Sequence, residues 1–157
     1  MVEQIKGLSH KYWRSSVDIR RYLHSHPELS FNENKTSQYI ESELRKLSLD
    51  GLSRVDQNGL LGTIHGKGSG KTILLRADID ALPILEENQH RFVSKNPGVM
   101  HACGHDAHTS MLIAVGKMKY DFYWNLFSLL VLPVFVFFML QIDINTFLYG
   151  QVFLMLV

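Results

Sequence analysis

The sequence is poor in several features that assign proteins to familiar classes. It has one cysteine in 157 residues, which excludes an internal disulfide framework and favours a reducing, cytoplasmic location. Its 16 Lys and Arg residues balance 15 Asp and Glu residues, so the excess of positive charge typical of nucleic-acid-binding proteins is absent. No apolar run precedes a small-residue cleavage site near the amino terminus, so no secretory signal is expected.

Few charged residues and no histidines follow Lys117. Residues 118–157 hold three of the 31 charged side chains, none of the eight histidines and 11 of the 17 aromatic residues. Residues 1–117 have the mixed composition of an ordinary globular domain. We therefore divide the chain into a domain at 1–117 and a strongly apolar, helical tail at 118–157.

Two amphipathic helices are predicted near the amino terminus. Apolar residues at helical spacing predict a helix over residues 9–24, which ends before Pro27. Ser30 and Glu33 form a capping-box pattern ahead of a second helix that ends near Asp50. The apolar face of that second helix is expected to hold Thr36, Ile40, Leu44 and Leu47.

Short apolar runs predict strands in the middle of the domain. Residues 60–65 and 72–76 are separated by a glycine-rich stretch, which predicts a hairpin of two adjacent strands. A third helix is expected over residues 107–116. Helices interleaved with strands indicate the α/β class, with the order of the strands left open.

The densest chemical signal is the sequence HACGHDAH at residues 101–108, which holds three imidazoles, a thiol and a carboxylate. Alternate side chains of an extended loop point the same way, so His101, Cys103 and His105 can face one site. Thiolate and imidazole are good ligands for Zn²⁺. Asp106 and His108 can form hydrogen bonds that orient a metal-binding side chain. The alternative is a helix amino terminus where polar residues happen to gather.

A second signal is Asp78 and Asp80, which follow the predicted strand at 72–76. Carboxylates two residues apart at a strand end point the same way, into the region where open α/β sheets bind ligands. Without other evidence, a solvated turn before Pro83 is the preferred interpretation of this pair.

Two further clusters are expected to be structural. His24, His26 and Glu28 lie at the end of the first predicted helix, where the helix dipole already accounts for histidine. Glu86 and Glu87 are expected to lie in a solvated loop, and no role is assigned to them.

Four segments resemble a known family. IRRYLHSHPELSF at 19–31, Thr36-Ser37, ILLRADIDALPI at 73–84 and GVMHACGHDAHTSML at 98–112 occur in the order seen in the metal-dependent amidohydrolases, which include aminoacylases, hippurate hydrolases and indoleacetyl-amino-acid hydrolases. The resemblance covers about residues 10–117.

The resemblance implies the amino-terminal portion of a zinc-peptidase-like, three-layer α/β/α domain that hydrolyses N-acyl amino acids with two divalent ions, Zn or Mn. It implies that Cys103 and His105 are metal ligands and that Asp80 is the catalytic carboxylate at the strand end. It assigns no ligand role to His101 or His108.

Parts of the family pattern are missing from the sequence. Family members continue with a Gln-Pro-Ala-Glu-Glu segment that holds a ligand and the general base, followed by further histidine ligands and an inserted dimerisation domain. Here the only acidic residues after Asp106 are Asp121 and Asp143, and no histidine follows His108. The sequence therefore predicts a truncated and inactive amidohydrolase.

The apolar tail has two interpretations. Residues 122–140 are uncharged and 19 residues long, close to the roughly 20 residues of a transmembrane helix, and Lys117 and Lys119 would keep the preceding domain cytoplasmic. The preferred interpretation is a frameshift or a truncated reading frame, because the family pattern stops where the composition changes. The alternative functions are a non-catalytic fragment that associates with a membrane or a partner, and a hydrolase with Cys103 as nucleophile and His105 as base.

Overall fold

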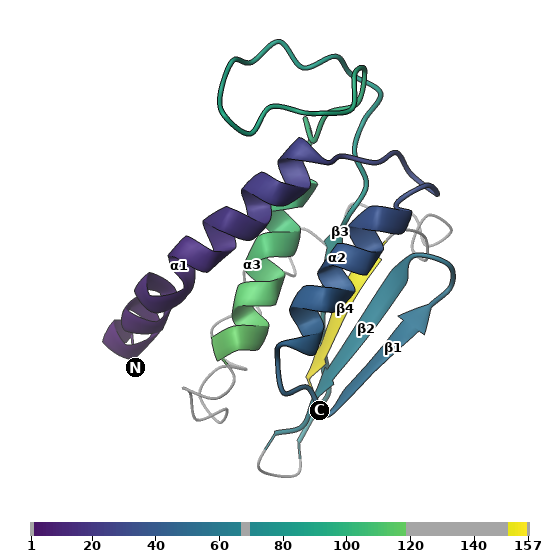
Figure 1. Ribbon diagram of the computed structural model, residues 1–157. Coiled ribbons are helices and arrows are strands. Elements are labelled where there is room, and N and C mark those ends of the chain that lie inside the picture. Colours follow the sequence, from purple (N-terminus) through teal and green to yellow (C-terminus); the bar gives the residue numbers. More distant parts are fainter. Residues whose placement is uncertain (1, 67–69, 119–150, 157) are drawn as a thin grey trace.

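The computed structural model describes residues 2–66, 70–118 and 151–156 as three helices and four strands (Figure 1). The helices are α1 (Val2–Ser25), α2 (Asn34–Arg45) and α3 (His105–Met118). The strands are β1 (Gly51–Val55), β2 (Gly59–Ile64), β3 (Ile73–Asp78) and β4 (Gln151–Leu156). The α/β class expected from the sequence is confirmed.

The strands form one mixed sheet in the order β1-β2-β4-β3. β1 pairs antiparallel with β2, β2 pairs parallel with β4, and β4 pairs antiparallel with β3. β2 and β3 are therefore not neighbours, and the hairpin predicted from residues 60–76 is wrong. The hairpin is instead β1–β2, where Asp56 adopts a left-handed conformation (φ 60°) in the turn between the strands.

β4 also corrects the expectation of a helical tail. Residues 151–156 form a central strand of the sheet, which pairs with β2 on one side and with β3 on the other. A short run that is apolar after Gln151 cannot be assigned to helix or strand by periodicity, which is why the sequence did not reveal this strand. The transmembrane helix predicted at 122–140 lies outside the described residues. Among the residues that were placed, no helix is both long enough and apolar enough to cross a membrane.

The helices cover one face of the sheet. α2 contacts β2, α3 contacts β3 and β4, and α1 packs along α3 (Figure 1). Within the described ranges the arrangement thus has two layers, helices over sheet, and the second helix layer of the expected α/β/α domain is not among them. Residues of both layers form the core: Ile19, Leu23, Ile40, Leu44, Leu60, Ile64, Leu75, Ala77, Ile79, Leu112 and Ile113.

α1 is longer than the helix predicted at 9–24. Its added amino-terminal turns are exposed, and an ion pair of 2.8 Å between Lys6 and Glu3 joins neighbouring positions on one helix face. Val2, Ile5 and Leu8 continue the helical spacing of apolar residues, but the prediction began the helix only after Leu8. The helix ends at Ser25, two residues before Pro27, as expected.

The capping box predicted for α2 does not form. Glu33 precedes the helix but makes no side-chain cap hydrogen bond. Its buried carboxylate instead accepts a hydrogen bond from the side-chain amide of Asn58 (3.0 Å). Glu28 takes the capping role, because its Oε2 accepts hydrogen bonds from the backbone N–H (2.8 Å) and the hydroxyl (2.9 Å) of Thr36. Ser30 donates to Asp80 instead (2.5 Å).

A segment without helix or regular strand connects β3 to α3. It lies near the carboxyl end of α1 (Figure 1), where isolated bridges pair Leu29 with Ala81 and Leu82 with Met100. Connections of this length often carry function. The segment includes Asp80 and Cys103, and His105 begins the helix that follows it.

Candidate metal centre

Asp80 and His105 meet where β3 ends and α3 begins. His105 Nδ1 lies 2.8 Å from Asp80 Oδ1 and 3.1 Å from the backbone oxygen of the same residue. The hydroxyl of Ser30 donates to the other carboxylate oxygen of Asp80. These contacts fix the His105 ring in one orientation, with Nδ1 occupied by Asp80.

The pair shifts the acidity of both partners. Partial burial disfavours the Asp80 carboxylate, but the hydrogen bonds of His105 and Ser30 outweigh this effect and lower the pKa of Asp80. The hydrogen bond with Asp80 raises the pKa of His105 against the opposing effect of burial. In the absence of a metal ion, the two side chains favour an ion pair.

Cys103 lies on the loop just before α3, with an exposed thiol. Gly104, between Cys103 and His105, has a left-handed φ of 86°, a conformation that side chains disfavour. Across the described parts of the chain, Cys103, His105 and Asp80 do not belong to a group of three ligating residues whose ligand atoms lie within 4.8 Å of one another. The ligand roles of Cys103 and His105 therefore stay predictions.

The two aspartates after β3 have different surroundings. Asp78 pairs with Arg76 at 2.5 Å, and its backbone oxygen accepts a hydrogen bond from Thr109 (2.9 Å). Asp80 instead contacts His105 and Ser30. The charge of Asp78 is thus balanced by Arg76, whereas Asp80 faces the HACGHDAH segment.

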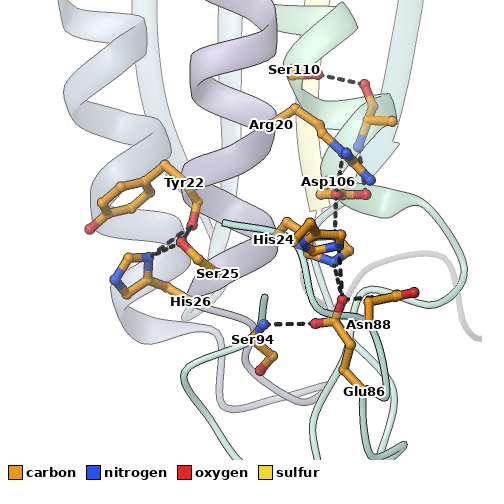
Figure 2. A network of polar contacts seen from close by, with 12 residues as sticks. Arg20, Tyr22, His24, Ser25, His26, Glu86, Asn88, Ser94, Asp106 and Ser110 are labelled. Carbon is orange, nitrogen blue, oxygen red and sulfur yellow. Dashed lines mark hydrogen bonds and ion pairs between the residues drawn. The ribbon is translucent and has the colours of Figure 1, made fainter. Parts of the chain in front are cut away.

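A buried polar network lies beside this pair (Figure 2). His24 lies between two carboxylates, with Nδ1 at 2.7 Å from Asp106 Oδ2 and Nε2 at 3.1 Å from Glu86 Oε1. Arg20 donates to the same Asp106 oxygen at 2.8 Å. Because Asp106 directly follows His105, α3 begins with two neighbouring residues that bind to different partners.

Glu86 corrects the expectation of a solvated loop. Its side chain is 2 % exposed and accepts hydrogen bonds from the backbone N–H of Ser94 (2.7 Å), from His24 and from Asn88 (3.1 Å). Burial works to raise the pKa of Glu86, but these hydrogen bonds outweigh it and lower the pKa to about 2. The sequence missed this residue because its partners are distant in the chain.

The remaining members of the predicted clusters have varied surroundings. His26 stacks on Tyr22 with 4.4 Å between ring centroids, so this residue has the structural role expected of it. His101 is buried, and burial lowers its pKa. Among the described atoms, neither ring nitrogen of His101 has a hydrogen-bond partner. His108 is exposed on α3.

Comparison with known proteins agrees with this arrangement. A model of the peptidase family M20/M25/M40 matches residues 74–128. An N-acyl-L-amino acid amidohydrolase of Geobacillus stearothermophilus is 47% identical over 116 residues, which make up 74% of this chain and 31% of that protein. Thermostable carboxypeptidase 1 of Saccharolobus solfataricus is 43% identical over 114 residues, 72% of this chain and 29% of that protein.

A solved structure extends the match to the fold. The Bacillus subtilis YXEP protein, described as a dinuclear metal-binding peptidase of the M20 family, matches with a TM-score of 0.60 and 27% identity over 94% of this chain. The chain spans 35% of that structure and 31% and 29% of the two curated relatives. The resemblance seen in the sequence is confirmed over the amino-terminal part of this chain, which matches the peptidase family M20/M25/M40 and its amidohydrolase relatives.

Proposed function

We propose that residues 1–117 provide the amino-terminal part of a metal-dependent amidohydrolase that cleaves the amide bond of N-acyl amino acids. In this proposal Cys103 and His105 bind a divalent ion, Zn or Mn, and Asp80 orients His105. The observation that carries it is the 2.8 Å contact between His105 Nδ1 and Asp80 Oδ1. The relatives that match this chain include an N-acyl-L-amino acid amidohydrolase, which supports the substrate class.

The side chains present are suitable in type for a metal ion but too few to complete its coordination. A metal-binding histidine usually donates its second ring N–H to a carboxylate, as His105 can to Asp80, and His105 Nε2 is then available as a ligand. The exposed Cys103 thiol adds a soft ligand that Zn²⁺ accepts. Two ligands do not complete a zinc site, and the resemblance implies that the other ligands come from segments absent from these 157 residues.

Each residue then has a definite task. A bound divalent ion would lower the pKa of a coordinated water towards about 7. Asp80 holds the Nδ1 proton of His105 and so selects the tautomer with a free Nε2. Ser30 donates to the second oxygen of Asp80 and keeps that carboxylate from rotating. Asp80 is thus a positioning group for His105.

We further propose that these 157 residues alone do not hydrolyse N-acyl amino acids. A general acid or base typically contributes a factor of about 10² to 10⁴ in rate. After Asp106 only Asp121 and Asp143 carry a carboxylate, and both lie in apolar sequence without a related motif. In this proposal the chain shares its ancestry and some metal-binding residues with the family, but not the family's activity.

Titration with Co²⁺ tests the ligand assignment. The proposal predicts a thiolate-to-cobalt charge-transfer band in the wild-type chain, and loss of that band in Cys103→Ser. Asp80→Asn should keep the band but weaken Co²⁺ binding by about 10- to 100-fold, because the carboxylate supports the ligand without touching the ion. A chain that shows no such band, or a band unaffected by Cys103→Ser, would exclude Cys103 as a ligand.

A further inference from the structure

His24, Glu86 and His90 converge on one carboxylate oxygen. His24 Nε2 lies 3.1 Å and His90 Nε2 lies 3.2 Å from Glu86 Oε1. One ligand atom from each residue lies within 4.8 Å of the other two, and across residues 2–66, 70–118 and 151–156 this is the one such group of three. α1 provides His24, and the connection between β3 and α3 provides the other two.

We propose that His24, Glu86 and His90 form a binding site for a divalent transition-metal ion, best matched by Zn²⁺, and that this site is separate from Cys103 and His105. Two imidazoles and one carboxylate are a donor set that Zn²⁺ accepts, with water as the fourth ligand. Because none of the three residues belongs to the HACGHDAH segment, the site does not depend on the proposed function.

The distances suit an ion in the middle of the group. Two ligands placed about 2.0 to 2.1 Å from a tetrahedral ion lie about 3.3 Å apart. The two separations from Glu86 Oε1 are 3.1 and 3.2 Å. These two separations are close to that value, and each ligand atom of the group lies within 4.8 Å of the other two.

Asp106 supports His24 from behind. His24 Nδ1 lies 2.7 Å from Asp106 Oδ2, so the ring donates its Nδ1 proton there and presents Nε2 towards Glu86 (Figure 2). Arg20 and the backbone N–H of Ala107 hold the Asp106 carboxylate, at 2.8 and 2.9 Å. A carboxylate behind a histidine is the usual arrangement around a protein-bound metal ion.

The charge and burial of the group favour a cation. The side chains of His24 and Glu86 are 4 % and 2 % exposed, so little water reaches the carboxylate that the two rings share. When an ion binds, each ligating Nε2 must give up any proton that it carries, which leaves two neutral imidazole ligands and one carboxylate ligand.

Unmet hydrogen bonding nearby is a second, independent observation. In the described structure, His90 Nδ1 and both ring nitrogens of His101 are buried without a hydrogen-bond partner. The centroid of the His101 ring lies 6.4 Å from that of His24. Buried polar atoms without partners are uncommon in native proteins and often mark a site for water or an ion. Here one of these atoms belongs to a proposed ligand, His90, and the other two belong to His101, a neighbour of His24.

An ion at this position would join α1 to an otherwise irregular segment. Glu86 and His90 lie between Ile84 and Gly98, a stretch that has neither helix nor strand. A metal that ties this stretch to the carboxyl end of α1 would hold it against the helix. We therefore assign the site a structural role.

Cobalt titration of the full chain, monitored by visible absorption and by circular dichroism, tests this inference. His90→Gln should remove one equivalent of bound Co²⁺, or weaken its binding more than tenfold. His10→Gln, which changes an exposed histidine of α1, should bind Co²⁺ as the wild type does. Cys103→Ser should retain the His90-dependent equivalent while losing the thiolate-to-cobalt band, so the two metal proposals can fail separately.

X-ray absorption of the zinc-loaded wild type after alkylation of Cys103 gives a test that needs no substitution. Zinc coordinated only by nitrogen and oxygen, with imidazole scattering, is the expected result. The inference is overturned if alkylation abolishes all zinc binding, or if His90→Gln retains every equivalent of Co²⁺ at wild-type affinity.

Discussion

His105 Nδ1 lies 2.8 Å from the carboxylate of Asp80, which precedes it by 25 residues, and this contact joins the end of β3 to the start of α3. Asp80 raises the pKa of His105, so Asp80→Asn should lower it, because burial then acts without the opposing carboxylate. The His105 ring protons, followed by NMR in metal-free protein, report this change. Ser30→Ala, which leaves the charge of Asp80 in place, should shift the pKa less.

The same pair determines a dependence of stability on pH. The raised pKa of His105 gives stabilisation that is complete below about 6.5 and is lost as the pH rises through the folded-state pKa. The lowered pKa of Asp80 gives stabilisation that is complete above about 3.8 and is lost as the pH falls through its folded-state pKa. The stability difference between the metal-free wild type and Asp80→Asn should therefore be largest between these limits. A difference independent of pH would refute the ion pair.

The lowered pKa of Glu86 predicts that acid destabilises the metal-free protein. Its pKa of about 2 lies below the ordinary 4.5, so its stabilisation is complete above 4.5 and is lost as the pH falls towards 2. Glu86→Gln should be less stable than the wild type at neutral pH and should lose less stability on acidification. Glu87→Gln is the matched control, because Glu87 is the exposed neighbour of Glu86. Equal acid unfolding profiles for the two variants would count against the network around Glu86.

Glu28, and not Ser30, should stabilise the start of α2. Glu28→Ala removes both hydrogen bonds to Thr36, and loss of a helix cap costs about 0.5 to 2 kcal/mol. Ser30→Ala should cost less, because Ser30 is exposed and makes no bond to the helix. Urea unfolding of the two variants decides between the capping residue in the structure and the one that the sequence pattern suggested.

β4 should be essential to the sheet because it pairs on both sides. Leu154 is in register with Gly62 of β2 and Leu75 of β3, and proline at this position cannot donate its backbone hydrogen bond. Leu154→Pro should expose the amides of β3 to hydrogen exchange. The amides that join β1 to β2 should be affected less, since that pairing does not include β4. Unchanged protection of β3 would contradict the strand order.

The sequence predicted the parts of the fold that depend on local pattern. Ile40 and Leu44 were expected on one face of the second helix, and both are buried in the core. The strand order could not be predicted, because the strand between β2 and β3 comes from the far end of the chain. The burial of Glu86 could not be predicted either, since it depends on His24, a residue 62 positions away.

The candidate site was predicted to a similar extent. The spacing of the HACGHDAH segment identified His105, and the position of Asp80 after a strand suggested a shared site; the two side chains are in contact. The sequence did not indicate that Asp106 and His105, which are neighbours, bind to different partners. Which partner each side chain takes depends on packing between elements distant in the chain.

An assay of N-acyl amino acid hydrolysis by the purified chain decides whether these 157 residues are inactive by themselves. The assay uses a panel of acyl amino acids with added zinc or manganese, a chelator control and the variant Cys103→Ala. Because the proposed function gives these 157 residues a metal-binding half-site without a general base, we predict no amino acid release that the chelator abolishes. Turnover that disappears both with chelator and in Cys103→Ala would contradict this account.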